Sequence, residues 1–224
     1  MIDYVLIRSR RKTMAIHIQD GHVKVRAPLR IPKREIDMFV LSKDAWISES
    51  LAKLAMRARQ QENFVVEYGS LITFRGKDYP IVSRSSKMAG FDGAHFYIPP
   101  GLTHGQIKVT CVQIYRRLAL IHFTNRVGYF AGIMGVAPSA IKINGAKTRW
   151  GSCSSKKSIN FSWRLVLAND DVIDYVIVHE MAHLTEMNHS SRFWAIVAGV
   201  LPGYSIQKAK LKALHERLAR ESWD

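Results

Sequence analysis

Hydrophobic and polar positions alternate through the first 30 residues, which is the pattern of β-strands. The segments 14–19 (MAIHIQ) and 22–27 (HVKVRA) flank an Asp-Gly pair. Alternation on both sides of Asp-Gly predicts a β-hairpin. From about residue 33 to residue 60, apolar residues recur at helical spacing instead. This change of period predicts helix after the opening strands.

Strand character returns between residues 64 and 98, and the run Pro99-Pro100-Gly101 then interrupts the chain. Proline and glycine in succession are the strongest local breakers of regular structure. We therefore expect a domain boundary here. It would separate a β-rich N-terminal region with helices, residues 1–100, from a second domain, residues 101–224.

The second half is expected to run from helix through strands to helix. Residues 103–134 have a helical pattern, and residues 140–165 read as strands joined by a turn. The last third is helical, with a long helix expected over residues 172–187. An interruption at Asn188-His189-Ser190 precedes a shorter helix and a basic terminal one. The pattern as a whole predicts an α+β protein.

Composition indicates an ordinary globular protein with a strongly basic surface. Apolar residues make up 47% of the chain, and the formal net charge is +15. The excess is spread over both halves without a dense basic run. It suits an anionic partner such as nucleic acid or nucleotide, and it suits equally a basic surface without such a partner.

The two cysteines, Cys111 and Cys153, are too few for a secreted disulfide framework. The first residues lack an apolar run of signal-peptide length, and no stretch approaches the length needed to cross a bilayer. We therefore expect a cytoplasmic protein without membrane insertion.

The residues with the clearest chemistry are His179-Glu180-Met181-Ala182-His183. On a helix, residues four apart lie on one face, so both imidazoles can reach one tetrahedral zinc ion. Glu180 would lie beside the metal and accept a proton from its water. Apolar residues flank the motif without Gly, Pro or charge inside it, as a helix buried on its far side requires.

A catalytic zinc usually has three protein ligands and an open position for water. His189 is a candidate for the third ligand if the turn around it bends back towards the metal. Glu186 is the competitor, because on a continuing helix it would share the face of His179 and His183. Its carboxylate could also hold a ligand imidazole without touching the metal.

Three runs extend the motif: RWGSCS (149–154), INFSWRLVLA (159–168) and IDYVIVHEMAHLTEMNHSSRFW (173–194). Together they resemble the YgjP-like metallopeptidase family, which belongs among the small zincins near the SprT and Wss1-like proteases. The resemblance extends over most of the chain. It implies a zincin-like catalytic domain with one zinc ion on His179, His183 and His189, and Glu180 as the base.

The segment before the motif has possible roles in substrate binding. In zincins an upstream strand usually borders the cleft, and an extended substrate can pair with it. Trp150 could form a wall of the cleft, and Arg149 could bind an anionic group of the substrate. Cys153 could approach the metal. Each of the three could instead be a plain packing or surface residue.

The main hypothesis is a zinc-dependent metallopeptidase that acts on peptides or proteins. An alternative keeps the site but changes the substrate, giving a metal-dependent nucleoside triphosphate pyrophosphohydrolase. A weaker alternative is a non-catalytic, basic nucleic-acid-binding protein with a structural metal. A structural site typically uses four protein ligands and has no need for Glu180.

Overall fold

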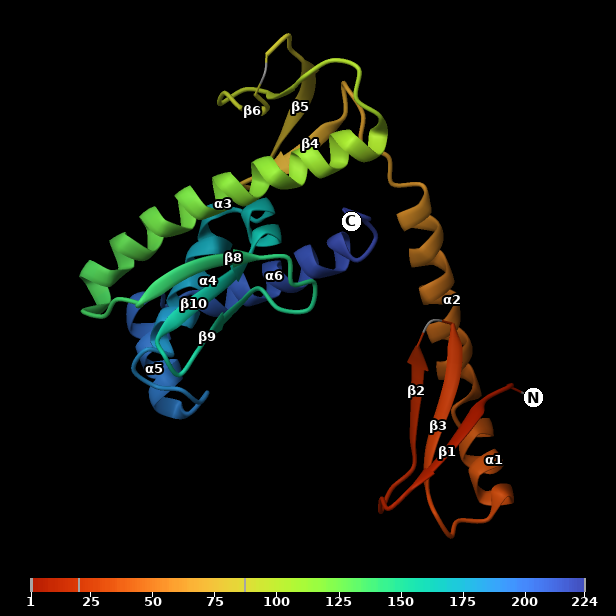
Figure 1. The fold of residues 1–224 in the computed structure, drawn as a ribbon. Coiled ribbons are helices and arrows are strands. Elements are labelled where there is room, and N and C mark those ends of the chain that lie inside the picture. The colour runs from red at the N-terminus through yellow and green to blue at the C-terminus, as the bar shows by residue number, and fades with distance from the viewer. Residues whose placement is uncertain (1, 20, 87, 224) are drawn as a thin grey trace. The chain divides into compact units, whose positions relative to one another are not determined.

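The computed structural model describes residues 2–19, 21–86 and 88–223, which form two compact units. Unit 1 is Met1–Phe64 with Ala219–Ser222, and unit 2 is Val65–Leu218 with the last two residues. Each unit is built from both strands and helices, so the α+β prediction is confirmed (Figure 1).

Unit 1 is a three-stranded sheet with two helices. Its elements are β1 (Val5–Ser9), β2 (Ala15–Gln19), β3 (His22–Pro28), α1 (Lys33–Leu41) and α2 (Asp44–Glu62). The sheet order is β1-β3-β2, with β1 parallel and β2 antiparallel to β3. The apolar residues of β3 face the helices and form a core, whose buried members are Val23, Val25, Ala27, Ile36, Val40 and Ile47.

The helix predicted from residue 33 to residue 60 is two helices in the structure. The first ends at Leu41, and the hydroxyl of Ser42, its C-cap residue, donates a hydrogen bond to the Phe39 carbonyl at 2.7 Å. Serine side chains compete in this way for the carbonyls of a helix. The second helix begins immediately afterwards, at Asp44.

Unit 2 contains two sheets and five helices of varied length within the described residues. The first sheet has β4 (Leu71–Phe74), β5 (Lys77–Ser83), β6 (Gly90–Phe91) and β7 (Phe96–Ile98), in the order β4-β5-β7-β6. The second sheet has β8 (Ala140–Asn144), β9 (Gly151–Cys153) and β10 (Ser158–Ser162), in the order β8-β10-β9. The helices are α3 (His104–Met134), η1 (Trp163–Leu167, a 3-10 helix), α4 (Asp170–Ala182), α5 (Ser191–Val200) and α6 (Tyr204–Leu218).

The boundary predicted at residue 100 lies inside unit 2, and the two compact units divide after Phe64 instead. The first sheet belongs to unit 2 because it packs on the helices that follow it. The tight turn between β4 and β5 docks on the start of α4. A Cβ added to Gly76 in that turn would lie 1.9 Å from Oδ1 of Asn169. In the same turn, Arg75 donates its amide to the Val166 carbonyl at 2.8 Å.

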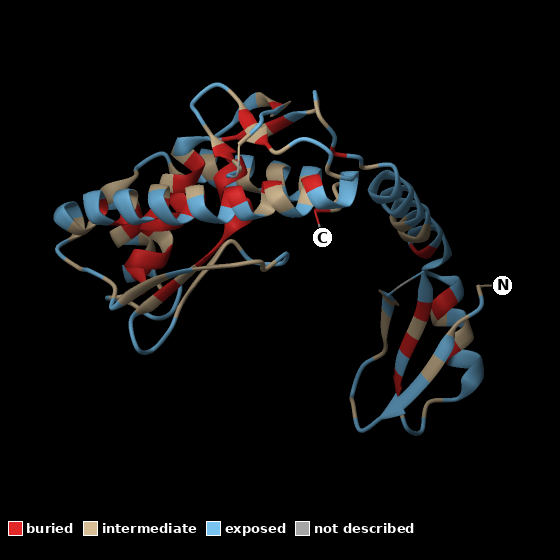
Figure 2. Ribbon diagram, turned by 45° about the horizontal axis from the view of Figure 1, so that its top comes forward, coloured by how far each residue is buried: buried red, intermediate tan, exposed pale blue. Residues whose placement is uncertain are grey.

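Helix α3 is the longest helix of unit 2, and both sheets and α4 pack along it (Figure 1). Its Tyr115 hydroxyl donates to the Thr73 carbonyl at 2.7 Å, and its Arg126 binds Asp174 of α4 through two hydrogen bonds. Buried residues gather in the elements beneath α3, while its outer side is exposed (Figure 2). Among the described residues, none of the helices combines the length and apolar character that crossing a bilayer requires.

Candidate metal centre

The centre is built on α4, whose residues are buried over most of its length. Val172, Ile173 and Tyr175–Val178 are buried, and the helix packs against α3, β9, α5 and α6. The helix begins after Asn169 with acidic residues in its first turn, which the positive end of the helix dipole favours. This packing fixes the direction of the face that carries His179 and His183.

Helix α4 ends at Ala182, with His183 as its C-cap, so the predicted continuation to residue 187 is wrong. The chain tightens into a turn in which the Glu186 amide donates to the Ala182 carbonyl at 2.9 Å. Glu186 therefore does not continue the helical face of the two motif histidines. Its carboxylate instead lies 3.8 Å from Arg192.

The backbone of that same turn orients His183. Nδ1 of His183 lies 3.1 Å from the Glu186 carbonyl oxygen. A carbonyl can only accept, so Nδ1 carries the proton and donates it. Nε2 is then left with a free lone pair, which is the form that binds a metal.

The turn between α4 and α5 brings His189 back to the motif. The Asn188 side chain accepts from the Ser190 amide at 3.0 Å, and the Ser190 hydroxyl caps α5 by accepting from Phe193. Nε2 of His189 then lies 3.0 Å from Nε2 of His179. One ligand atom from each of His179, His183 and His189 lies within 4.8 Å of the others.

The separation between the His179 and His189 nitrogens fits two ligands of one metal ion. Nitrogen ligands at about 2.0–2.1 Å from a tetrahedral zinc ion lie about 3.3 Å from one another. The separation of 3.0 Å between two imidazole nitrogens is close to that value. Among the described residues, this group of donor atoms consists of imidazoles alone, without cysteine or carboxylate. Such a set suits zinc and other late transition metals.

Burial keeps the motif histidines neutral. It lowers the pKa of His179 to about 4, helped by the positive charges of His183, His189 and Lys208 when these are protonated. Burial also lowers the pKa of His183. At neutral pH both imidazoles are therefore unprotonated and able to act as ligands.

Glu180 follows His179 on α4 and is only 6% exposed. Burial raises the pKa of its carboxyl to about 7. Gly151 of β9 packs directly against it, since a Cβ there would lie 2.5 Å from Cγ of Glu180. A carboxyl in this setting can both accept and release a proton near neutral pH.

Aromatic side chains of α5 pack against the histidines. The Phe193 ring lies 4.9, 4.5 and 4.7 Å from the rings of His179, His183 and His189. The Trp194 ring is stacked on that of His189 with centroids 5.8 Å apart. The ligand side chains are thus held by packing as well as by hydrogen bonds.

Two tyrosines also pack at this centre, of which the sequence singled out only Tyr204, as a weak candidate for an electrophilic helper. The Tyr204 ring stacks between the rings of Trp194 and Tyr175, at 5.2 and 6.1 Å. Tyr175 in turn contacts His179, with ring centroids 6.0 Å apart. Tyr175 lies one helical turn before His179, and this spacing in the sequence indicates that the two share a face of the helix. Tyr204 is 25 residues beyond His179, so helical spacing does not relate the two.

The remaining candidates lie on β9 or just before it and are not members of the group of three histidines. Arg149 is exposed just before β9, and Trp150 is half-buried with its ring 6.2 Å from that of His215 on α6. Cys153 is a free, half-buried thiol on β9. Burial raises its pKa, and the Glu180 carboxylate raises it further, so the thiol lies near Glu180 but in its protonated form.

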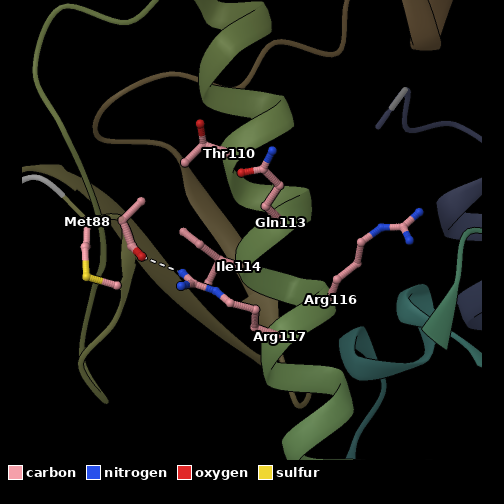
Figure 3. A pocket seen from close by; sticks show the side chains of 7 residues that line it. Met88, Thr110, Gln113, Ile114, Arg116 and Arg117 are labelled. Carbon is pink, nitrogen blue, oxygen red and sulfur yellow. Dashed lines mark hydrogen bonds between the residues drawn. The ribbon is translucent and has the colours of Figure 1, made fainter. Parts of the chain in front are cut away.

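A separate hollow of about 350 Å³ lies beside α3, lined by residues of that helix together with Met88 and Ala89. Arg117 spans it to donate to the Ala89 carbonyl, while Arg116 points away from Arg117 (Figure 3). None of the predicted site residues lines it. It is therefore not part of the metal centre.

Comparison with known proteins identifies the family. The model of the YgjP-like metallopeptidase domain matches residues 12–214. The chain belongs to this family. As a YgjP-like metallopeptidase it is a metal-dependent hydrolase. The group of three histidines described above agrees with this assignment, because it could hold a metal ion. A search of curated proteins gives no match.

Two similar solved structures are metallopeptidase zymogens. Abylysin from Pyrococcus abyssi has 23% identity and a TM-score of 0.39, over 45% of this chain and 98% of that one. Jannalysin from Methanocaldococcus jannaschii has 20% identity and a TM-score of 0.37, over 42% of this chain and 95% of that one.

Proposed function

We propose that this chain is a zinc-dependent peptidase in which His179, His183 and His189 hold one zinc ion and Glu180 acts as the general base. The observation that carries the proposal is the convergence of three imidazoles, two of them on the helix that also carries one buried carboxyl. A purely structural site would gain nothing from that carboxyl, and burying it costs free energy. Bound there, zinc supplies Lewis acidity, which acidifies water and polarises a carbonyl oxygen.

The protein's own groups then perform the proton transfers. The Glu180 carboxylate accepts a proton from the attacking water and returns it to the amine of the leaving peptide. Its pKa of about 7 suits both steps. Packing against Gly151 holds the carboxyl in place, which keeps the geometry of the transfer fixed.

An extended peptide is the substrate that the surroundings of Glu180 favour. In the second sheet β9 pairs with β10 on one side only, and among the described residues it is an edge strand beside α4. An edge strand can bind an extended peptide by main-chain hydrogen bonds. We place the substrate along β9, with Arg149 at its start available to an anionic side chain.

The base is tested by Glu180→Gln. This variant keeps the shape of the side chain but cannot accept the proton, so kcat for casein hydrolysis falls by about 10²–10⁴-fold. Zinc content, measured by elemental analysis, stays at one ion per chain. Glu216→Gln, an exposed glutamate on α6, serves as the control and keeps wild-type turnover. Wild-type turnover in Glu180→Gln would refute the role of the base.

The substrate class is tested separately by offering the zinc-loaded protein casein and nucleoside triphosphates in parallel. We expect cleavage of casein and no release of pyrophosphate. Hydrolysis of triphosphates alone would show that the same centre acts on phosphoanhydrides instead.

A further inference from the structure

Two basic segments that are separate in the sequence meet at one end of the sheet of unit 1. The parallel pairing of β1 with β3 sets Arg8 beside Ala27 and Ser9 beside Pro28. Because the strands run in the same direction, the loops that follow them leave the sheet at the same end. The cations gathered here are Arg10, Arg11, Lys12, Arg26 and Arg30, which we name the cationic sheet end.

Within the described residues, no member of the cationic sheet end forms an ion pair or a side-chain hydrogen bond. Residues 8–19 and 21–34 contain no aspartate or glutamate, and Asp20 lies outside the described residues. Elsewhere arginines are paired, as Arg84 is with Asp92. Cations that share a small surface without counter-ions create a positive potential that attracts an anionic partner.

The loop that carries Arg30 is fixed before any partner binds. One terminal nitrogen of the Arg8 guanidinium donates to the carbonyls of Pro28, Leu29 and Ile31, at 3.1, 2.9 and 2.8 Å. These charge-assisted hydrogen bonds hold the turn between β3 and α1 in one shape. A preformed surface loses less conformational entropy on binding.

The positive surface continues from this end along the open face of the sheet. In the register of the sheet, Lys24 lies opposite His17 on β2, and neither residue is buried. Arg26 is likewise exposed on β3, two residues further along. Cations spread along β3 and over the two loops at this end of the sheet fit a polymer with regularly spaced charges better than a single small anion.

We propose that the cationic sheet end binds the phosphate backbone of nucleic acid. Four of its five cations are arginines, whose planar guanidinium groups bind phosphate through paired hydrogen bonds. Residues 8–12 and 26–30 contain no aromatic side chain that could stack on bases or anchor the loops in a lipid surface. The binding is therefore to phosphates and independent of base sequence.

The test uses the full chain and fluorescein-labelled DNA of random sequence, single-stranded and duplex, with anisotropy measured over a salt series. We expect affinity to fall steeply with salt, with a slope of about 4 in the logarithms if all five cations contact phosphate. The triple variant Arg10→Gln, Lys12→Gln, Arg30→Gln should bind at least ten-fold more weakly and lower that slope by about 3.

A matched triple variant separates local binding from net charge. Lys43, Arg57 and Arg59 are exposed cations of the same unit outside the cationic sheet end, and changing all three to glutamine removes the same charge. We expect it to bind DNA nearly as wild type does. Equal weakening by both triple variants, or absence of binding by the wild type at low salt, would overturn the proposal.

Two further measurements complete the test. Vesicles containing phosphatidylserine should not bind, and binding to these vesicles without binding to DNA would replace nucleic acid by a lipid surface as the partner. Thermal unfolding of both variants verifies that they are folded. Casein hydrolysis by the triple variant should stay at the wild-type rate, so the outcome does not depend on the proposed peptidase activity.

Discussion

At the scale of single residues, the candidate centre depends on a close approach between β9 and the side chain of Glu180. Gly151 permits this approach, because a Cβ there would lie 2.6 Å from Oε1 of Glu180 as well as 2.5 Å from its Cγ. Neither group can easily move, since the glutamate is buried and the strand is paired with β10. A methyl group at this position therefore has to displace one of them.

We predict that Gly151→Ala lowers kcat/KM for casein by about 100-fold, the size of effect that a displacement near 1 Å can cause. It should also destabilise the fold by about 1–3 kcal/mol through overpacking. Gly199→Ala on α5 is the control, because a Cβ there meets nothing within 4 Å. That variant should be stabilised by about 0.5–1 kcal/mol. Full activity in Gly151→Ala would show that the contact is not needed.

At the scale of elements, α4 is anchored at its first residue. Asp170 accepts two hydrogen bonds from Arg75 in the turn between β4 and β5. The hydrogen bonds from Arg75 are the main cause that lowers the pKa of Asp170. Since the carboxyl titrates at lower pH in the folded chain, the pair stabilises the fold above the unfolded pKa of about 4 and loses its effect as pH falls through the folded pKa.

We predict that Asp170→Asn lowers the free energy of unfolding at pH 7 by about 0.5 kcal/mol, because the pair is largely exposed to solvent. The difference from the wild type should shrink as the pH falls below 4 and vanish once Asp170 is protonated in the folded chain. Thermal unfolding of both proteins between pH 7 and pH 2 measures it. A difference that stays constant to pH 2 would mean that the ion pair is not its source.

At the scale of the whole molecule, unit 1 has a hydrophobic core of its own. Ile47 of α2 is fully buried in that core among residues of β3 and α1. We predict that Ile47→Ala destabilises unit 1 by about 2–5 kcal/mol. Hydrogen exchange should become faster in the amides of residues 2–64, while zinc affinity and the protection of α4 stay unchanged. Loss of protection throughout α4 would show that the two units unfold together.

Local pattern was sufficient for most elements but not for where α4 ends. The alternation around the Asp-Gly pair predicted β2 and β3, and the helical spacing predicted α3 and α4. The pattern wrongly extended α4 to residue 187, because apolar and polar residues there still follow a helical period. The turn is formed by backbone hydrogen bonds to Met181 and Ala182, which periodicity does not report.

Local pattern was also insufficient to locate the boundary between the two compact units, which depends on contacts between residues far apart in the sequence. Proline and glycine at 99–101 interrupt the chain, but an interruption does not decide which side the preceding strands pack on. Burial of Phe96 against Tyr115 of α3, with ring centroids 5.3 Å apart, joins the first sheet to unit 2. Contacts between residues that are distant in the sequence decide such a division, and the local sequence pattern does not indicate these contacts.

The sequence by itself determined the pair of histidines and the glutamate, because the geometry of one helical turn places residues four apart on one face. It also determined the overall positive charge. Only the tertiary structure decided that His189 meets His179, that the Glu186 backbone orients His183, and that burial shifts the pKa of Glu180 to about 7. The parallel pairing of β1 with β3 likewise brings basic residues of two separate segments together in the cationic sheet end. Each of these depends on groups distant in sequence or on exclusion of water, which no local pattern encodes.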